Sequence, residues 1–482
     1  MPDHIMSVDL ANPIPLNEDA AEHHGWLSKL QGNILRSHGR DYSAHVFCRL
    51  PDDIGAARAV LRRLIPYVTS ARQQYVDTCH RRKTGEGSTL FGTLSLSASG
   101  YRAIGFAGLS AFEEPKENAR DPDACFLGGM KAHPDDLADP PVDEWEPPFR
   151  GRIDAMLLLA HASRDAVLQA VATAQALIAP GHVTSIEFGD QIRNGAGQAI
   201  EHFGFVDGRS QPLYLKDDFE TDVWGRPRRE AKGDRPLERW IPFEPLGRVL
   251  RPDPFGVDAS CLGSFLVFRK LEQDVRGFAA AETRLAHALK LEGTAAERAG
   301  AMVVGRFRDG SPLTSSASPG WHPHADNDFT YAEDPCCRRC PAHAHVRRVN
   351  PRGSVDGDAE RVRRLTRRGV TYGDTSAVAG PDVSPESLPD TGVGMLFMAY
   401  QASIRRQFAF VQKQWIASPD FPRSRTGPDP LVGGTTAAAG ATHKWPTNFN
   451  GAEHVPLSFG SYVRMLGGEF FFTPSVPFLQ TL

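Results

Sequence analysis

The order of apolar segments in the first half of the chain is the feature that most restricts its fold. Short runs rich in β-forming residues, which predict strands, lie at 44–50, 89–97, 155–162 and 183–189. Two amphipathic segments, 56–68 and 164–179, place apolar residues three and four positions apart and predict helices. The predicted order is therefore βαββαβ. This order is typical of a ferredoxin-like unit, in which both helices cover one face of an antiparallel sheet.

A more interrupted copy of this order occupies the second half. Strands are predicted at 264–271, 395–401 and 468–474, and helices at 279–291, 295–304 and 405–415. The predicted fold class is thus α+β, with two ferredoxin-like halves and antiparallel sheets. A doubly wound parallel sheet is the competing fold, but neither GxGxxG nor a P-loop follows any predicted strand.

A Pro- and charge-rich stretch, 211–258, separates the two copies and is interpreted as linker and insertion rather than core. The predicted organisation has four parts: an N-terminal extension (1–25), an N-terminal half (26–215), a linker or insertion (216–260) and a C-terminal half (261–482).

Charge and composition narrow the class of partner. The 482 residues include 54 basic and 58 acidic side chains, a net charge of -4, so no single-sign field would attract nucleic acid or an anionic membrane. A small-molecule partner is expected, and whether the chain forms a homo-oligomer stays open. No run approaches a membrane span, and the acidic opening does not look like a signal peptide, so we expect a cytoplasmic protein. Seven cysteines, an odd number, favour reduced thiols over a disulfide framework.

The first chemically unusual segment is FGFVDGRSQP (203–212), in which Gly204 and Gly208 bracket Asp207. Glycines allow a tight turn and a close approach of backbone to a flat ligand, while the turn presents a carboxylate. An ordinary Asx-type turn explains the same spacing and stays open as an alternative.

The second segment is CCRRCPAHAHVRRVNPRG (336–353), which contains C-x-x-C from Cys337 and Cys340. Covalent c-type haem is excluded because Pro341 stands where the histidine of that motif belongs. A zinc site from both cysteines, His343 and His345 has suitable ligands, although the ligand pairs are closer together than in usual zinc fingers.

A single neutral imidazole on haem iron is the remaining metal hypothesis for this segment. Arg347, Arg348 and Arg352 stand nearby, where they are expected to meet propionate carboxylates. A solvated basic loop is the alternative without function. The third segment, RVRRLTRRGVTYG (361–373), is also basic, and its alternative interpretation is the exposed end of a helix closed by Gly369.

Taken together, GFVDG, AHVRRVNPR and LTRRGVTYG resemble the three signatures of the dye-decolourising peroxidase family. LQGNILRSHGRD, GSFLVFRKLEQDV, GMLFMAYQASI and GGEFFFTPSVPFL resemble further stretches of its longer members, so the resemblance extends over 30–482. It implies two ferredoxin-like halves with haem beside the second. It also implies a haem peroxidase that uses hydrogen peroxide to oxidise dyes, phenolics and other aromatic reductants.

The resemblance also assigns roles to individual residues. It implies that His345 ligates the iron of one non-covalent haem b, and that Asp207 and Arg367 act on the peroxide side, with Arg368 as the fallback. The further cofactor-binding residues that we assign are Ser210, Arg306, Arg352 and Phe397.

One departure from the family pattern concerns the imidazole of His345. Family members often carry an acidic residue where this chain has Gln-Phe-Ala-Phe at 407–410. The sequence therefore identifies no carboxylate partner for His345, and we expect its ring to bond a carbonyl or water instead.

Two rival functions remain at this point. One is a zinc-dependent hydrolase or binding module that uses Cys337, Cys340, His343 and His345, and the other is a non-catalytic haem carrier or sensor. If the chain is a peroxidase, Tyr372 and Trp415 are candidates to relay electrons from bulky dyes, although aromatic residues near helix ends more often belong to the core.

Overall fold

The structure is a computed structural model that describes residues 8–85, 89–106, 108–178, 181–220, 240, 242–320, 327–355, 357–434 and 440–482. Its main feature is a ten-stranded sheet in the order β10-β11-β8-β14-β2-β3-β1-β4, with β7 and β9 paired off this path. All pairings between its strands are antiparallel. The predicted α+β class with two ferredoxin-like halves is confirmed.

The N-terminal half supplies four strands: β1 (Tyr42–Cys48), β2 (Phe91–Leu96), β3 (Ala155–His161) and β4 (Val183–Asp190). Their order, β2-β3-β1-β4, is that of a ferredoxin-like unit. The connecting helices are α2 (Ile54–Leu64) and α7 (Arg164–Ile178). The apolar face of α2 is buried as its spacing predicts, and Asp53 caps the helix by accepting a hydrogen bond from the backbone N–H of Ala56 at 2.7 Å.

The C-terminal half repeats this order. Its strands are β8 (Leu262–Gln273), β9 (Thr366–Arg367), β10 (Val370–Tyr372), β11 (Gly394–Gln401) and β14 (Val463–Thr473). The interpretation of 361–373 as an exposed helix end is wrong. Helix α12 (Gly357–Arg361) ends at the first residue of this segment, and the β-forming residues around Gly369 pair with β11 as β9 and β10.

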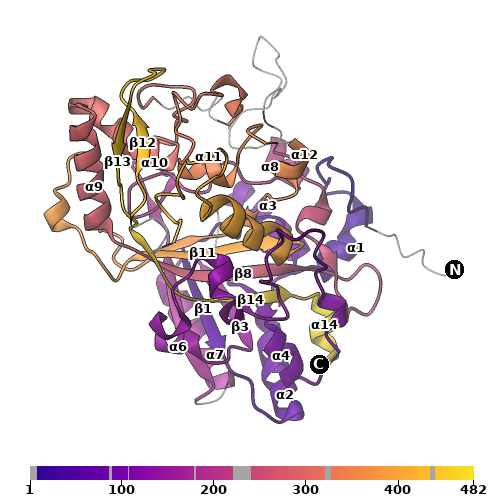
Figure 1. The fold of residues 1–482 in the computed structure, drawn as a ribbon. Helices are drawn as coiled ribbons and strands as arrows, with labels where there is room; N and C mark the ends of the chain where they lie inside the picture. Colours follow the sequence, from indigo (N-terminus) through magenta and orange to yellow (C-terminus); the bar gives the residue numbers. More distant parts are fainter. Residues whose placement is uncertain are drawn as a thin grey trace.

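The two halves share one continuous sheet because β14 pairs with β2 through Phe472 and Leu96. The far ends of the sheet also meet. Thr371 of β10 accepts a hydrogen bond from the backbone N–H of Ile192 at 3.3 Å and donates one to the carbonyl of Asp190. The sheet is therefore strongly curved, and its two ferredoxin-like units form one body (Figure 1).

Helices of the C-terminal half lie over the sheet, with α11 above β8 and β11 in Figure 1. They are α9 (Val275–Ala288), α10 (Glu297–Val304) and α11 (His345–Val349). The helix predicted at 405–415 is present as two π-helical segments, η9 (Ile404–Ala409) and η10 (Val411–Ile416). Wide π-helical turns recur at functional sites. This arrangement places one face of the sheet opposite α11 and η10.

The remaining α-helices and short strands connect or flank the two ferredoxin-like units. The helices are α1 (Ala21–Lys29), α3 (Ala71–Thr84), α4 (Ala98–Ala103), α5 (Pro134–Leu137), α6 (Pro147–Arg150), α8 (Lys216–Glu220) and α14 (Val476–Thr481). The short strands are β5 (Ile192–Arg193), β6 (Ala199–Ile200), β7 (Arg251–Pro252), β12 (His443–Pro446) and β13 (His454–Leu457). None of the helices within the described ranges has the length and apolar character to span a bilayer.

The stretch predicted as linker and insertion contributes to the core at its end. Leu246, Val249 and Leu250 are buried in the main apolar cluster. Residues 221–239 and 241, which hold most of the charged part of this stretch, lie outside the described residues. All seven cysteines carry free thiols, as expected.

Candidate active site

A cavity of about 280 Å³ lies between the curved sheet and the helices that cover it. It gathers residues that are far apart in the chain, from the loop after β6, from α10 and α11, and from β8, β9, β11 and β14. Six of the seven site residues assigned from the sequence line it: Asp207, Ser210, Arg306, His345, Arg367 and Phe397. The seventh, Arg352, lies directly behind Ser210, to whose hydroxyl it donates a hydrogen bond at 2.6 Å.

The walls of the cavity are mostly apolar. The sheet contributes Leu271, Met395, Phe397 and Met465. The helical side contributes Val304, Val346, Val349, Phe408 and Ile416. An apolar slot with a few convergent polar groups is the usual environment of a bound cofactor or small ligand.

His345 is the first residue of α11, and its orientation is fixed by a carboxylate. The Nδ1 atom lies 2.8 Å from Oδ2 of Asp429, a fully buried side chain. The other carboxylate oxygen, Oδ1, accepts hydrogen bonds from the backbone N–H groups of Leu431 and Val432 at 2.8 and 3.2 Å. Because a carboxylate is an acceptor, Nδ1 carries the ring hydrogen, and the lone pair is left on Nε2.

The expectation that His345 bonds a carbonyl or water is wrong, because its ring bonds the carboxylate of Asp429. The anchoring carboxylate does exist, but it comes from the loop after η10 rather than from the helix at 407–410. Burial alone would raise the pKa of Asp429. The neighbouring His345 and Arg348 and the backbone N–H of Leu431 favour the charged form and hold this pKa below its usual value.

The cysteine and histidine residues of the rival zinc hypothesis are not brought together. His343 points to another part of the fold, where its ring lies 4.6 Å from that of His443 and 4.3 Å from that of Trp445 between centroids. Cys340 is fully buried in a small cluster with Phe329 and Tyr331. Across the described ranges, no three His, Cys, Asp or Glu side chains are grouped so that they could hold a metal ion.

Arg347 and Arg348 do not line the cavity, contrary to the expectation that they meet propionates. Arg347 donates to the carboxylate of Asp334 at 3.0 Å and to the carbonyl of Cys340 at 2.7 Å. Arg348 donates to backbone carbonyls, among them that of Trp415 at 2.8 Å. Both guanidinium groups are buried and fix the chain around α11.

Asp207 is held at the cavity wall by a tightly packed loop. Its backbone N–H donates to the carbonyl of Ala199 in β6 at 2.9 Å. Gly204 has φ +89°, and a Cβ atom there would lie 2.2 Å from the carbonyl oxygen of Ala379. Only glycine therefore allows this loop to pack as it does.

Glu201 is a site residue that sequence reasoning missed. Its carboxylate accepts hydrogen bonds from the backbone N–H groups of Phe203 and Phe205 at 2.8 and 3.0 Å, and from the Gln273 side chain at 2.5 Å. It thus braces the loop that ends in Asp207. Burial raises the pKa of Glu201 to about 7, and the nearby Asp207 contributes to this rise.

Arg367 lies beside Asp207. Its Nη1 atom is 3.4 Å from Oδ1 of Asp207, and its Nη2 atom donates to the carbonyl of Arg209 at 2.9 Å. The adjacent Arg368 faces the opposite side of β9, where it donates to the carbonyls of Asn33 and Ile34 at 2.7 and 2.9 Å. The carboxylate of Asp207 and the guanidinium group of Arg367 thus both line the cavity, whereas Arg368 does not.

A polar cluster at one edge of the cavity joins the remaining assigned residues. The Nη2 atoms of Arg306 and Arg352 donate to the hydroxyl of Ser210 at 3.0 and 2.6 Å. The carboxamide of Asn327 accepts from Arg306 at 2.9 Å and from Ser210 at 2.8 Å. Two buried guanidinium groups in one place make this edge strongly positive, which suits a carboxylate-bearing ligand.

The proposed relay residues are both buried. Trp415 lies in η10 and stacks on Phe421 with ring centroids 5.0 Å apart, and only 6% of its surface is exposed. Tyr372 lies in β10 and is 8% exposed. Neither side chain presents a broad surface to a bulky dye.

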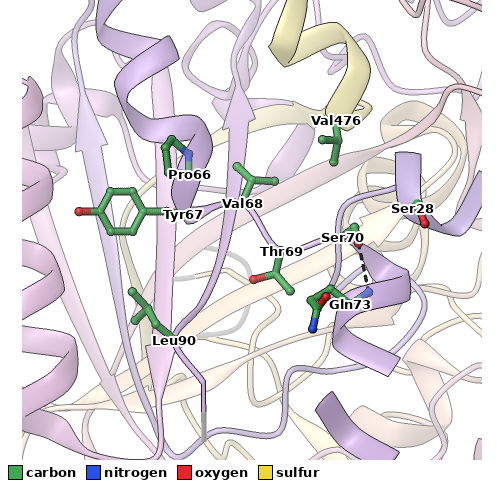
Figure 2. A pocket seen from close by; sticks show the side chains of 9 residues that line it. All are labelled: Ser28, Pro66, Tyr67, Val68, Thr69, Ser70, Gln73, Leu90 and Val476. Atoms are coloured by element: carbon green, nitrogen blue, oxygen red, sulfur yellow. Dashed lines mark hydrogen bonds between the residues drawn. The ribbon is translucent and has the colours of Figure 1, made fainter. Parts of the chain in front are cut away.

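A second hollow lies outside the sheet, between the segment that follows α2 and the C-terminal α14 (Figure 2). Its lining includes Tyr67, Thr69, Ser70 and Gln73. Among the described residues, no charged side chain and no histidine lines it. We assign it no chemistry, because apart from the hydroxyl of Tyr67 its lining offers no acid/base group, and within the described ranges it holds no His, Cys, Asp or Glu side chain that could bind a metal.

Comparisons with known proteins identify the family of the chain. Residues 263–447 match the family described as "Dyp-type peroxidase, C-terminal". The chain is 39% identical to the multifunctional dye peroxidase DyP2 of Amycolatopsis sp., over 99% of this chain and 100% of that protein. It is 30% identical to the dye-decolorizing peroxidase msp1 of Mycetinis scorodonius, over 81% of this chain and 75% of that protein.

Solved structures give the same result. The crystal structure of the DyP-type peroxidase AnaPX of Anabaena sp. superposes with a TM-score of 0.86 at 35% identity, and 98% of each chain is covered. DyP2 of Amycolatopsis sp. superposes with a TM-score of 0.87 over 98% of this chain and 100% of that chain. The chain therefore belongs to the dye-decolourising, or DyP-type, peroxidase family.

Proposed function

We propose that this protein is a haem peroxidase that uses hydrogen peroxide to oxidise dyes, phenolics and other aromatic small molecules. The observation that carries the proposal is the convergence, in one apolar cavity, of an anchored imidazole, an Asp–Arg pair and an arginine-rich edge. Family membership supplies the class of reaction, and this convergence supplies residues for each part of it.

The residues of the cavity fit a non-covalent haem b. His345 would hold the iron through Nε2, since its Nδ1 is engaged by Asp429. The apolar walls would cover both faces of the macrocycle, and Ser210 and Arg306, backed by Arg352, would meet its propionates. Phe397 would lie on the face opposite His345. Haem bound here supplies an iron centre that peroxide oxidises by two electrons and that aromatic reductants restore.

Asp207 and Arg367 divide the work on peroxide. The carboxylate of Asp207 takes a proton from one peroxide oxygen and returns it to the other, which then leaves as water. Arg367 stays charged at any ordinary pH, so its role is electrostatic: its donors stabilise the negative charge that develops on the departing oxygen. The 3.4 Å contact between the two side chains keeps both groups at one place on the cavity wall.

The test is peroxide-dependent oxidation of an anthraquinone dye by the purified, haem-loaded protein, together with measurement of its iron and zinc content. The proposal predicts dye bleaching that requires both haem and peroxide, with iron and without stoichiometric zinc. Haem binding without dye oxidation would indicate a carrier or sensor, and zinc without haem would indicate the hydrolase or binding module.

A further inference from the structure

A second Asp–Arg pair lines the same cavity, and the roles proposed above leave it unused. Asp139 lies in the loop after α5, and Arg269 lies in β8; both contribute to the cavity wall. An Nη2 hydrogen of Arg269 is donated to Oδ1 of Asp139. The two side chains are only 3% and 6% exposed, against 28% for Asp207 and 35% for Arg367.

The strand register places this pair on the same sheet face as Arg367. Arg367 of β9 is opposite Ala399 of β11, and Arg269 of β8 is opposite Phe397 of β11. Residues two apart on a strand share a face, so Arg367, Phe397 and Arg269 project toward the cavity together. With two strand spacings between them, the backbones of the two arginines are about 10 Å or more apart. Phe397 thus stands between two Asp–Arg pairs.

The second pair has unused hydrogen-bonding capacity. Oδ2 of Asp139 is buried and has no hydrogen-bond partner among the described residues. Arg269 is fixed by its Nε donor to the sulfur of Met465 at 3.2 Å and by the ring of Phe408, 5.5 Å from its guanidinium carbon. A buried ion pair contributes little net stability compared with apolar residues of similar size, and a buried acceptor without a partner costs free energy. This cost indicates a function beyond stability.

We propose that Asp139 and Arg269 form a second proton-accepting site on the Phe397 face of the cavity, which takes up a small weak acid with its proton on Asp139 and its anion beside Arg269. The inference rests on the proposed function, because it concerns the face on which peroxide would react. Peroxide belongs to this class of ligand, as does hydrogen cyanide.

The proton transfer is balanced without any further reactant. The H–X bond of the acid breaks, an O–H bond forms at Oδ2 of Asp139, and X⁻ keeps the electron pair. Protonation also removes the negative charge that Arg269 faces, so the guanidinium becomes free to pair with X⁻. Burial raises the pKa of Asp139 to about 6 although Arg269 opposes the shift, so this carboxylate accepts a proton more readily than an ordinary aspartate.

The test measures cyanide association with the ferric holoenzyme through the shift of the Soret band, which needs no turnover. In an Asp207→Asn background, adding Asp139→Asn is expected to slow association by a further ~10- to 100-fold, because the second proton acceptor is lost. Asp135→Asn, an exposed aspartate of the neighbouring α5, is the matched control and should leave the rate unchanged. If the Asp207→Asn/Asp139→Asn protein binds cyanide at the same rate as Asp207→Asn alone, the inference is overturned.

Two further results keep the test decisive. Asp139→Asn leaves Arg269 without its counter-ion, so Asp139→Asn/Arg269→Gln, in which the pair is neutral, is made in the same background. This variant is expected to bind haem and to show the same slow association. If it does not bind haem, the pair is purely structural and the inference fails. If wild-type protein shows no cyanide shift although it holds haem, the proposed iron site fails instead.

Discussion

The imidazole of His345 donates its Nδ1 hydrogen to the carboxylate of Asp429, 84 residues further along the chain, at 2.8 Å. The carboxylate is completely buried, and two backbone N–H groups hold its second oxygen. The direction in which Nε2 points is therefore set by the loop after η10 as well as by α11. An iron ligand held in this way is more basic and better oriented than an imidazole in water.

Asp429→Asn is expected to weaken haem binding by roughly 10- to 100-fold, the usual effect of losing a group that orients a metal ligand. The amide keeps the size of the side chain but removes the charge that favours hydrogen on Nδ1. Titration of the apoprotein with haem, followed in the Soret region, measures the change. Asp420→Asn, in an exposed turn of the same loop, is the control. Equal haem affinity in the Asp429 variant and the control would show that the contact does not orient a ligand.

Asp207→Asn is expected to slow the reaction with peroxide by about 10²- to 10⁴-fold, because the proton acceptor is lost. Arg367→Leu removes one preorganised charge and is expected to cost on the order of 10²- to 10³-fold. Both variants should still bind haem, since neither residue is placed as an iron ligand. Stopped-flow measurement of the Soret change on mixing with peroxide gives the rates.

Arg406→Leu serves as the control for these two variants, because Arg406 is half-exposed and pairs with Glu117 away from the cavity. Wild-type rates in both cavity variants would mean that peroxide reacts elsewhere. The two expected ranges overlap, and within this overlap we expect the loss in Arg367→Leu to be at least equal to the loss in Asp207→Asn.

Glu201→Gln is expected to change how stability depends on pH. The folded-state pKa of Glu201 is raised by burial from 4.5 to about 7, so between these values the folded protein holds a proton that the unfolded chain has released. Stability from this group is therefore fully present below 4.5 and is lost as the pH rises toward 7. Glutamine does not titrate and removes this loss, which is on the order of 3 kcal/mol.

Urea unfolding of wild type and Glu201→Gln at about pH 5 and about pH 8 measures this effect. The wild type should lose more stability than the variant between the two conditions. An equal loss in both proteins would show that Glu201 titrates normally. Glu292→Gln, at an exposed position, controls for a general effect of removing one carboxylate.

Replacement of Cys337 and Cys340 by serine is expected to leave the haem spectrum and peroxidase turnover nearly intact, since neither thiol reaches the cavity. Because Cys340 is fully buried, a modest loss of stability is expected, and Cys48→Ser in the other half is a control of equal burial. Metal analysis accompanies the spectra. Release of bound zinc together with unfolding would support the rival zinc site.

Local pattern was enough to predict the repeated βαββαβ order, because each strand and helix buries a face that its own residues define. The strand β10 was not recognised, since it has only three residues and depends on pairing with β11. Its conformation is a tertiary effect, and the basic residues before it resemble an exposed helix end. The pairing of Phe472 with Leu96, which joins the two halves of the sheet, likewise cannot be predicted from the local pattern of apolar residues.

Some residues of the candidate site could likewise be predicted from the sequence, and others could not. Asp207, His345 and Arg367 stand in dense motifs and could be named from the sequence, and all three line one cavity. Asp429, Glu201 and Asp139 could not, because each acquires its meaning from contact with a residue distant in the chain or from burial. For Arg347 and Arg348 the sequence predicted a ligand contact that the structure does not support, because neither residue lines the cavity. Their place beside His345 in the sequence suggested a ligand contact, whereas the direction of their side chains leads them to buried carbonyls and Asp334.

The assignment of His345 as the iron ligand is tested by comparing His345→Ala with His343→Ala after both are purified with haem supplied. His343→Ala should keep a Soret band and peroxide-dependent dye oxidation, because the ring of His343 packs on His443 and Trp445 outside the cavity. His345→Ala should lose haem, or hold it without turnover, because the substitution removes the imidazole that lines the cavity. A wild-type haem spectrum and full turnover in His345→Ala would show that His345 does not ligate the iron.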